Sequence, residues 1–239
     1  MNGVKVGIIG IGNMGSAHLR MITGGNIPDM TVTAVCDIDT EKLNAARNTY
    51  PALRVFEDYT DLLKNSDTNA VIIAVPHPLH AKIAIEAFKY GKHVLVEKPL
   101  DITVSAAEDL CAAAEKSGKV FAIMFNQRTN GLFRKAREIV KSGELGEIKR
   151  SVWIITNWYR TQSYYDSSKW RATWAGEGGG VLLNQAPHNL DIWQWICGSP
   201  SAVTAFCSVG KFHNIEVEDE ATIYAEYENG ATGVFITST

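Results

Sequence analysis

The chain has 239 residues, of which 46% are hydrophobic and 21% are charged, and its formal net charge at pH 7 is −3. This composition excludes an intrinsically disordered chain, which combines low hydrophobicity with high net charge. It also argues against a nucleic-acid partner, because the chain lacks the excess of basic residues that neutralises phosphates. The longest apolar runs, such as Val71–Val75, are far too short to cross a bilayer, so no membrane partner is expected.

The cysteines and the first residues of the chain indicate a cytoplasmic protein. The cysteines show no CxxC spacing and each lies in an apolar stretch, so we expect reduced, buried thiols and no metal site. They are Cys36, Cys111, Cys197 and Cys207. The amino terminus runs directly into a glycine motif and lacks the pattern of a secretory signal.

The first half of the chain alternates short apolar strands with helices. The expected strands are Val4–Gly10, Thr31–Asp37, Arg54–Phe56, Ala70–Val75, Lys92–Glu97 and Val120–Phe125. The expected helices are Asn13–Thr23, Thr40–Thr49, Asp58–Lys64, His80–Tyr90 and Thr103–Lys116. Continuously apolar strands indicate a sheet buried on both faces, and their alternation with helices indicates right-handed βαβ units. We therefore predict an α/β domain with a doubly wound parallel sheet over residues 1–124.

Residues 125–239 follow a different pattern. A helix (Leu132–Lys141), an extended segment (Glu147–Trp158), an aromatic loop (Tyr159–Trp174), a glycine cluster (Gly176–Gly180) and a helix (Leu190–Ile196) come first. Strands are then expected at Ala202–Val209, Asp219–Tyr227 and Ala231–Thr237. The turn Glu228-Asn229-Gly230 predicts a hairpin between the last two strands, and hence an α+β domain with an open, mainly antiparallel sheet. The strand pattern continues to Ser238-Thr239 without a turn or cap, so we expect this domain to be incomplete. The alternative is a native edge strand at the end of the chain.

A GxGxxG motif lies between the first strand and the first helix. Gly10 permits the tight turn, Gly12 lets the backbone approach a pyrophosphate, and Gly15 lets the helix pack closely on the sheet. The first helical residues, Asn13 and Met14, bring N–H groups and the positive end of the helix dipole to the phosphates. We predict a dinucleotide site at this loop.

Asp37 ends the second strand, 22 residues after Gly15, where a carboxylate that binds the ribose hydroxyls is expected. A carboxylate there repels a 2′-phosphate, so NAD is favoured over NADP. The alternative is that Asp37 is only a helix N-cap or a solvated acid in a turn.

Glu97-Lys98-Pro99 follows the fifth strand, at the sheet edge where doubly wound folds bind ligands. We expect Lys98 to serve as a proton donor or to stabilise a substrate oxygen beside the cofactor. The alternative is an ordinary surface lysine in a turn. Further cofactor contacts are expected from Pro76, His80 and Glu97.

Asn184 and His188 are four residues apart, which would place them on one helix face unless Pro187 interrupts the helix. Histidine is the natural general base for a hydroxyl proton at neutral pH. The alternative is a histidine that is hydrogen-bonded in a helical core. Asp191 either orients the imidazole or caps the surface.

Together these motifs resemble the glucose–fructose oxidoreductase / inositol dehydrogenase / rhizopine catabolism (Gfo/Idh/MocA) family over essentially the whole chain. The resemblance implies a Rossmann domain, a second domain with a large open sheet, and NAD(P)-dependent oxidation or reduction of sugars, cyclitols and related polyols. It implies that Lys98 and His188 are the catalytic residues and that Arg128 lies in a segment lining the nicotinamide. Asn184 stands at the family's usual aspartate position. Since an amide cannot relay a proton, we expect Asn184 to bind a substrate hydroxyl.

Aromatic and polar residues gather in one loop of the second half. Aromatic faces beside hydrogen-bonding side chains suit a sugar ring, so we expect substrate contacts here. The residues are Trp158, Arg160, Trp170, Arg171 and Trp174. The alternative of equal weight is a core or subunit-interface strip.

The sequence thus predicts hydride transfer between nicotinamide and a hydroxyl carbon, with His188 removing the hydroxyl proton and Lys98 stabilising the oxyanion; it leaves open which is the formal base. Two other functions remain open, a non-catalytic sensor that binds dinucleotide or sugar and an NAD-dependent glycosidase. A homo-oligomer is expected, because the open sheet would otherwise be uncovered.

Overall fold

The computed structural model describes residues 3–239. The chain divides into two compact units, with the boundary between Met124 and Phe125. Each unit is described by itself. No helix within the described range is long and apolar enough to cross a membrane.

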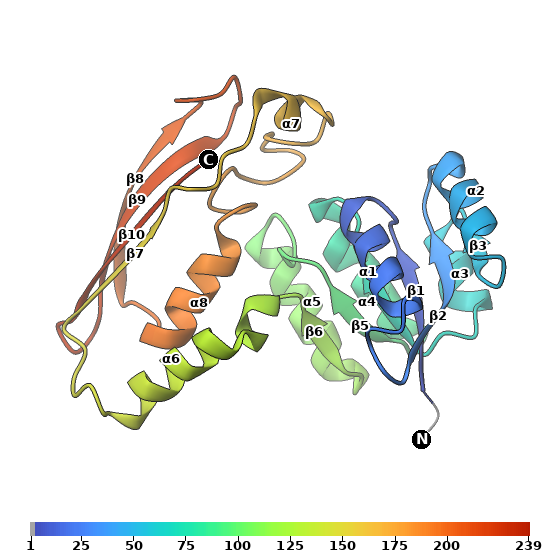
Figure 1. Cartoon of the computed structure of the whole chain (residues 1–239), viewed down its shortest axis with the longest axis horizontal. Helices are drawn as coiled ribbons and strands as arrows, with labels where there is room; N and C mark the ends of the chain where they lie inside the picture. Colours follow the sequence, from blue (N-terminus) through green and yellow to red (C-terminus); the bar gives the residue numbers. More distant parts are fainter. Residues whose placement is uncertain (1–2) are drawn as a thin grey trace. The chain divides into compact units, whose positions relative to one another are not determined.

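The first unit contains a six-stranded sheet in the order β3-β2-β1-β4-β5-β6, and every pair of neighbouring strands is parallel (Figure 1). The strands are β1 (Val4–Ile9), β2 (Met30–Cys36), β3 (Arg54–Phe56), β4 (Ala70–Ile73), β5 (His93–Val96) and β6 (Phe121–Ile123). The strand order reverses between β1 and β4, and doubly wound folds bind their ligands at such a reversal, at the carboxyl ends of the strands. The predicted doubly wound sheet is confirmed.

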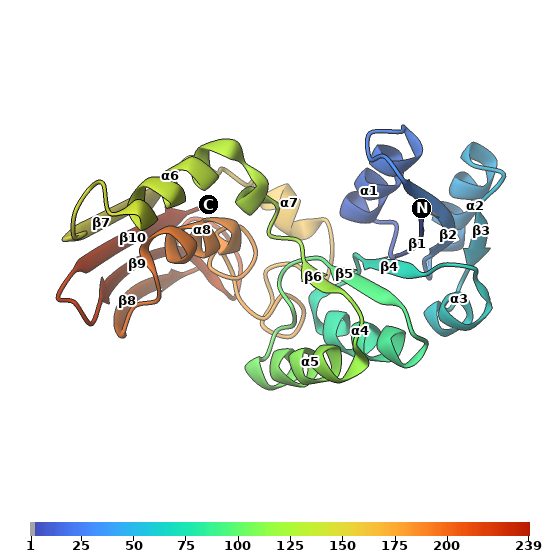
Figure 2. The same ribbon diagram turned by 90° about the horizontal axis from the view of Figure 1, so that it is seen from below.

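Helices cover both faces of this sheet. They are α1 (Asn13–Thr23), α2 (Thr40–Thr49), α3 (Tyr59–Asn65), η1 (His77–Leu79), α4 (His80–Lys89) and α5 (Val104–Ser117). Figure 2 shows α1 and α2 on one face and α3, α4 and α5 on the other. Leu19 and Leu43 pack in the first layer, and Leu62 and Leu110 pack in the second. Burial on both sides explains why the strands are apolar without alternation.

The second unit contains a four-stranded sheet in the order β7-β10-β9-β8. The strands are β7 (Arg150–Ile155), β8 (Ala202–Val209), β9 (Glu218–Glu226) and β10 (Thr232–Ser238). The hairpin between β9 and β10 forms as predicted, and Gly230 supplies the positive φ of +78° that its turn requires. The sheet is mainly antiparallel, as expected, although β7 pairs with β10 in parallel. A hairpin signal reports only neighbours in sequence, so it could not reveal this pair.

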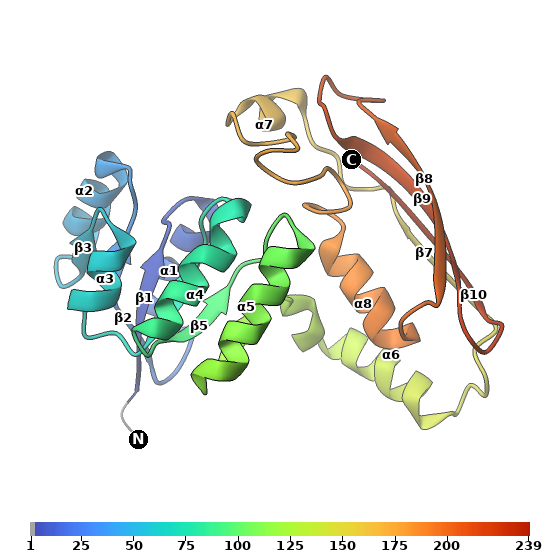
Figure 3. The ribbon, with the colours of Figure 1, turned by 180° about the vertical axis from the view of Figure 1, so that it is seen from behind.

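Helices cover only one face of the second sheet. The helical segments are η2 (Asn126–Thr129), α6 (Gly131–Ser142), α7 (Gln162–Asp166) and α8 (Pro187–Cys197). Figure 3 shows α6 and α8 on the same side of the sheet. Trp193 packs on Phe235 with ring centroids 5.6 Å apart, and Phe133 packs on Trp153 at 5.9 Å. The aromatic loop includes α7, which the sequence pattern did not indicate.

The opposite face of this sheet carries two mainly apolar rows across the four strands, each of which includes one threonine, Thr204 or Thr222. The register places Val152 in line with Val234 and Tyr224, and Ile154 in line with Ile236 and Phe206. The most exposed members are Val152, Ile154 and Phe206, which are 55%, 59% and 74% exposed.

The four cysteines are free thiols, but they are not all buried. Cys36 lies in the core and Cys197 is half-buried, whereas Cys111 and Cys207 are exposed, so the prediction of four buried thiols is wrong for these two. Cys111 lies on the solvent side of α5, and Cys207 lies on β8, the edge strand of the second sheet.

Candidate active site

The glycine loop joins β1 to α1, and its three glycines have different surroundings. Gly10 has a φ of +87°, and a Cβ there would lie 2.5 Å from the Ala74 carbonyl oxygen. A Cβ on Gly15 would lie 1.8 Å from the Gly10 oxygen. At Gly12, by contrast, a Cβ would meet no described atom within 4 Å. Gly10 and Gly15 therefore maintain the fold of the loop, and Gly12 leaves open space.

This open space suits a dinucleotide pyrophosphate. Helix α1 begins at Asn13, and the preceding residue, Gly12, has no side chain to cap the first N–H groups. Asn13 and Met14 are exposed. Uncapped N–H groups and the positive helix end form an anion site, so these residues fit the phosphates of NAD.

Asp37 lies directly after β2 beside this loop. Its Oδ2 accepts a hydrogen bond from the Ile11 N–H (2.8 Å), and its Oδ1 accepts one from the Asp39 N–H (3.0 Å). Helix α2 is capped by Asp39, whose carboxylate accepts from the Glu41 and Lys42 N–H groups. Asp37 is therefore not the cap of that helix, and its position at the strand end is the one expected of a ribose ligand.

The Glu97-Lys98-Pro99 turn follows β5 at the carboxyl edge of the same sheet. Lys98 is half-buried, and the Lys98–Pro99 peptide bond is cis. Glu97 is buried, and its Oε1 lies 2.7 Å from His18 Nε2 on α1. The structure thus places Glu97 as a support of the turn rather than as an open cofactor ligand.

His80 supports the same turn from the other side. It is 1% exposed, with Nδ1 2.6 Å from the Pro99 carbonyl oxygen and Nε2 2.8 Å from that of Val75. Burial lowers the pKa of His80, and the two carbonyl contacts offset part of this effect. Among the predicted cofactor contacts near β4, only Pro76 is exposed. His80, by contrast, lies in the interior, because it begins α4 and the first turn of this helix faces the sheet.

In the second unit, His188 is the second residue of α8 and is half-buried. Its ring packs edge-on against Phe125, with centroids 6.1 Å apart. His188 and Asn184 do not share a helix face, because the helix begins at Pro187, the residue expected as a possible interruption, and Asn184 lies in the preceding turn. Proline favours the first helical position, where its missing N–H has no helical partner to lose.

The glycine cluster before α8 packs closely on β9. A Cβ on Gly180 would lie 1.8 Å from the Glu218 carbonyl oxygen. The buried Glu218 carboxylate accepts hydrogen bonds from the Gly180 and Leu182 N–H groups, at 2.9 and 3.0 Å. These contacts set the course of the turn that carries Asn184.

Glu177 is a site residue that the sequence analysis missed. It is 1% exposed, accepts a hydrogen bond from the Ala172 N–H (2.7 Å), and accepts another from the Asn184 side-chain amide. Arg171 Nη1 lies 3.8 Å from its Oε1. Glu177 therefore brings together Arg171 and Asn184, two predicted substrate contacts. The sequence contained one signal for Glu177, namely a carboxylate between two glycines. A carboxylate that becomes buried there requires polar partners, so it indicates a site where several side chains meet.

The aromatic loop forms a stack of alternating rings and guanidinium groups. The Arg160 guanidinium carbon lies 5.8 Å from the Trp158 ring centroid and 5.0 Å from that of Tyr164. The Arg171 guanidinium carbon lies 4.4 Å from Tyr164 and 4.9 Å from Trp170. Four predicted substrate contacts thus share one stack.

The remaining predicted substrate contact of this loop, Trp174, is not part of the stack. Trp174 is 53% exposed, and its backbone N–H donates to the Glu216 carboxylate (2.7 Å).

Arg128 and Asp191 form an ion pair within the second unit. Arg128 Nε and Nη2 donate to the two Asp191 oxygens at 2.8 and 2.5 Å. Asp191 therefore does not cap the surface, because its carboxylate is buried and accepts both hydrogen bonds from Arg128. The interaction raises the pKa of Arg128 further. Arg128, predicted as a cofactor contact, joins η2 to the helix that carries His188.

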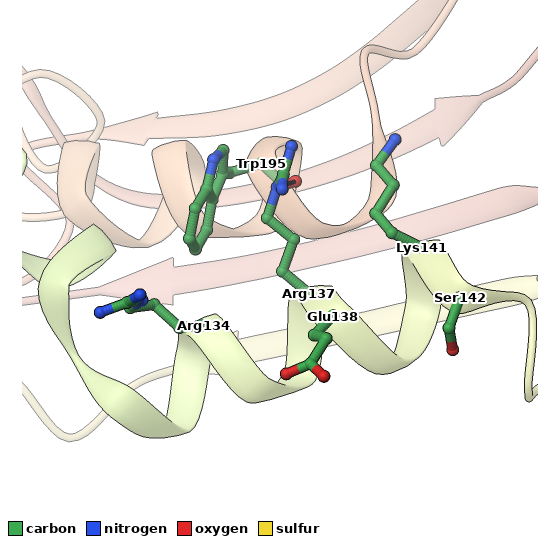
Figure 4. A pocket seen from close by; sticks show the side chains of 6 residues that line it. All are labelled: Arg134, Arg137, Glu138, Lys141, Ser142 and Trp195. Atoms are coloured by element: carbon green, nitrogen blue, oxygen red, sulfur yellow. Dashed lines mark hydrogen bonds between the residues drawn. The ribbon is translucent and has the colours of Figure 1, made fainter.

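A surface pocket lies between α6 and α8 (Figure 4). It is lined by Arg134, Arg137, Glu138, Lys141, Ser142 and Trp195, none of which was predicted as a site residue. Trp195 lines this pocket, with the Arg137 guanidinium carbon 4.7 Å from its ring centroid. No group of three or more His, Cys, Asp or Glu side chains arranged for a metal ion occurs among residues 3–239.

Comparison with known proteins identifies the family. Residues 4–125 match the oxidoreductase family with an NAD-binding Rossmann fold, and residues 133–239 match the GFO/IDH/MocA C-terminal domain. YrbE, an oxidoreductase of Bacillus subtilis, is 29% identical over 237 residues, which cover 97% of this chain and 66% of YrbE. Inositol 2-dehydrogenase of Salmonella typhimurium is 35% identical over 146 residues, which cover 60% of this chain and 43% of that enzyme.

A solved structure of the WlbA dehydrogenase from Bordetella pertussis, in complex with NADH and UDP-GlcNAcA, superposes with a TM-score of 0.92 at 27% identity. The match covers 99% of this chain and 71% of WlbA. The chain thus spans about two thirds, or less, of the length of the curated relatives it matches. Both halves nevertheless match in order, and the chain belongs to the GFO/IDH/MocA family of oxidoreductases, with an NAD-binding Rossmann domain followed by the family's C-terminal domain.

Proposed function

We propose that the protein transfers a hydride between NAD and a hydroxyl-bearing carbon of a sugar, cyclitol or related polyol. The observation that carries this proposal is the position of Lys98, which lies at the carboxyl edge of the same sheet as the glycine loop, in a turn held by His18 and His80. Relatives named as an inositol 2-dehydrogenase and as a dehydrogenase solved with NADH and UDP-GlcNAcA support this substrate class.

When bound, the nicotinamide would accept or donate the hydride. His188 removes the proton of the reacting hydroxyl, and the Lys98 ammonium group stabilises the negative charge that develops on its oxygen. The Asn184 amide donates to Glu177, so its carbonyl oxygen is the group that accepts a hydrogen bond from a substrate hydroxyl. Glu177 fixes the orientation of this amide.

The test is the absorbance of reduced nicotinamide after the protein is mixed with NAD and a panel of sugars, cyclitols and glycosides. Turnover is expected with one class and should fall at least about 100-fold in His188→Ala and in Lys98→Ala. Lys141→Gln, in the pocket between α6 and α8, is the matched control and should keep full turnover. Full turnover in both alanine variants would refute the catalytic assignment. Release of free sugar without NADH would indicate a glycosidase, and tight NADH binding without turnover would indicate a sensor.

We further infer that a second copy of this chain covers the open face of the four-stranded sheet. The two apolar rows through Val152 and Ile154 match the surface that one sheet buries against another. Ile154→Lys should therefore convert an oligomer into monomers in light scattering, whereas Lys149→Glu, directly before β7, should not. A cytoplasmic location is in keeping with the four free thiols and can be tested by cell fractionation.

A further inference from the structure

The aromatic loop holds two positively charged groups close together. The guanidinium carbons of Arg160 and Arg171 lie 5.0 and 4.4 Å from one ring centroid, that of Tyr164. They are therefore no more than about 9.4 Å apart. Two like charges at this separation, in a partly buried stack, repel each other unless carboxylates neutralise them.

Only one of the two charges is balanced. Arg171 lies 3.8 Å from the buried Glu177 carboxylate and donates to the Tyr164 hydroxyl at 2.7 Å. Arg160 has no carboxylate within 4.0 Å among residues 3–239, and its guanidinium donates no hydrogen bond to any described residue. The Nε atoms of both arginines are buried without a hydrogen-bond partner among the described residues, so the two differ in the nearby carboxylate and not in Nε. Arg160 as a whole is only half-buried, so an anionic ligand can reach its guanidinium and supply the acceptor that the buried Nε lacks.

The neighbouring carboxylates are already engaged. Asp219 is fully buried and accepts hydrogen bonds from the N–H groups of residues 211–213, and Glu218 accepts from those of Gly180 and Leu182. His213 connects this region to the loop, because its Nε2 lies 2.8 Å from the Arg160 carbonyl oxygen. The backbone at Arg160 is thus fixed, and neither carboxylate is available to its guanidinium.

We propose that Arg160 binds a carboxylate or phosphate group of the substrate, so that the enzyme prefers an anionic sugar to a neutral one. This inference rests on the proposed dehydrogenase function and names the substrate class of the same site. The planar guanidinium matches the geometry of two anionic oxygens, and the rings of Trp158 and Tyr164 hold it in one orientation. The Arg171–Glu177 ion pair has no net charge, so it holds the neighbouring rings of the stack without adding to the positive charge of Arg160.

The test compares sugars that differ only in the anion: D-glucose, D-glucuronate and D-glucose 6-phosphate, with UDP-glucose as a nucleotide-linked member. Binding is followed by tryptophan fluorescence, because all six tryptophans lie between Trp153 and Trp195 and one of them stacks on Arg160. NAD reduction is measured in parallel. We expect at least one anionic member to bind about tenfold more tightly than glucose, and to lose this advantage in 0.5 M salt.

Arg160→Gln should remove the advantage of the anionic member, so the affinity for that member should fall about tenfold more than the affinity for glucose. Arg160→Lys retains the charge and should keep part of the advantage, which provides a second variant if the glutamine substitution unfolds the loop. Lys169→Gln removes an exposed charge from the same loop and is the matched control. A preference for glucuronate identifies the anion as a carboxylate, and a preference for a phosphorylated member identifies it as a phosphate.

Equal affinity for neutral and anionic members, absence of binding by every anionic member, or an equal loss for both kinds in Arg160→Gln would overturn the inference. A failure of the proposed function is a different result. In that case no member of the panel reduces NAD, while the fluorescence titration still decides whether Arg160 binds the anion.

Discussion

His18 Nε2 and Glu97 Oε1 lie 2.7 Å apart, and this contact connects the helix after the glycine loop to the turn that carries Lys98. Both side chains are largely buried, at 13% and 9% exposure. On the other side of the turn, His80 contacts the Pro99 carbonyl oxygen. Two histidines from separate helices therefore hold the backbone on either side of Lys98.

Replacing His18 tests the first of these supports. His18→Leu leaves the Glu97 carboxylate buried without this donor, so we expect unfolding free energy to fall by about 1–3 kcal/mol. Turnover should fall as well, because the Lys98 turn loses its anchor. His18→Gln keeps an N–H donor and should recover much of both quantities. Urea unfolding and steady-state rates measure them, and identical behaviour of the two variants would contradict this role.

Two substitutions in the glycine loop should distinguish an effect on cofactor binding from an effect on folding. Gly12→Ala adds a Cβ where none of the described atoms lies within 4 Å, so the melting temperature should change little while NADH binding weakens at least tenfold. In Gly15→Ala the Cβ would meet the Gly10 oxygen at 1.8 Å, so the folded state itself should be destabilised. Calorimetry and NADH fluorescence distinguish the two. Unchanged NADH affinity in Gly12→Ala would contradict the prediction that this loop binds the pyrophosphate.

Asp37 should determine the preference for NAD over NADP. Asp37→Asn keeps an oxygen that can accept the Ile11 N–H but removes the negative charge. We therefore expect the ratio of NADPH to NADH affinity to rise about tenfold or more, because repulsion of the 2′-phosphate is lost. Asp39→Asn, at the cap of α2, is the control with the same charge change. An equal shift in both variants would show that only the net charge matters.

His80 should make stability depend on pH. Its folded-state pKa is lowered below the ordinary value of 6.5, chiefly by burial, so the unfolded chain binds the proton first. Unfolding free energy should therefore decrease as pH falls below about 6.5, and this group should contribute no slope above that value. His80→Gln cannot titrate and should give a flatter profile between pH 7 and 5. Parallel profiles for the two proteins would contradict the assignment.

Glu177→Gln should impair substrate binding more than cofactor binding. The variant leaves Arg171 without its carboxylate and weakens the orientation of Asn184. We expect KM for the sugar to rise about tenfold with little change in NADH affinity. Glu138→Gln, on the exposed side of α6, is the control. Equal losses for both ligands would indicate general unfolding of the loop.

Most of the structural features that could be predicted follow from patterns among residues that are close together in the sequence. The six parallel strands follow from continuous apolar runs that alternate with helices, and the hairpin before Ala231 follows from its Asn-Gly turn. Gly10, Gly12 and Gly15 were identifiable because each role depends on residues close by in the chain. The parallel pairing of β7 with β10 was not, because these strands are far apart in sequence and no local signal records their register.

The sequence by itself determined the fold class, the glycine loop and the residue types available for chemistry, since these depend on periodicity and spacing. Only the tertiary structure decided which side chains meet. It paired Arg128 with Asp191, placed Glu177 between Arg171 and Asn184, and gave Arg160 no carboxylate partner within the described part of the chain. It also moved His80 from the expected cofactor surface into the interior. The physical reason is that a buried charged or polar group takes its partners from any element that packs against it, and linear spacing does not encode that packing.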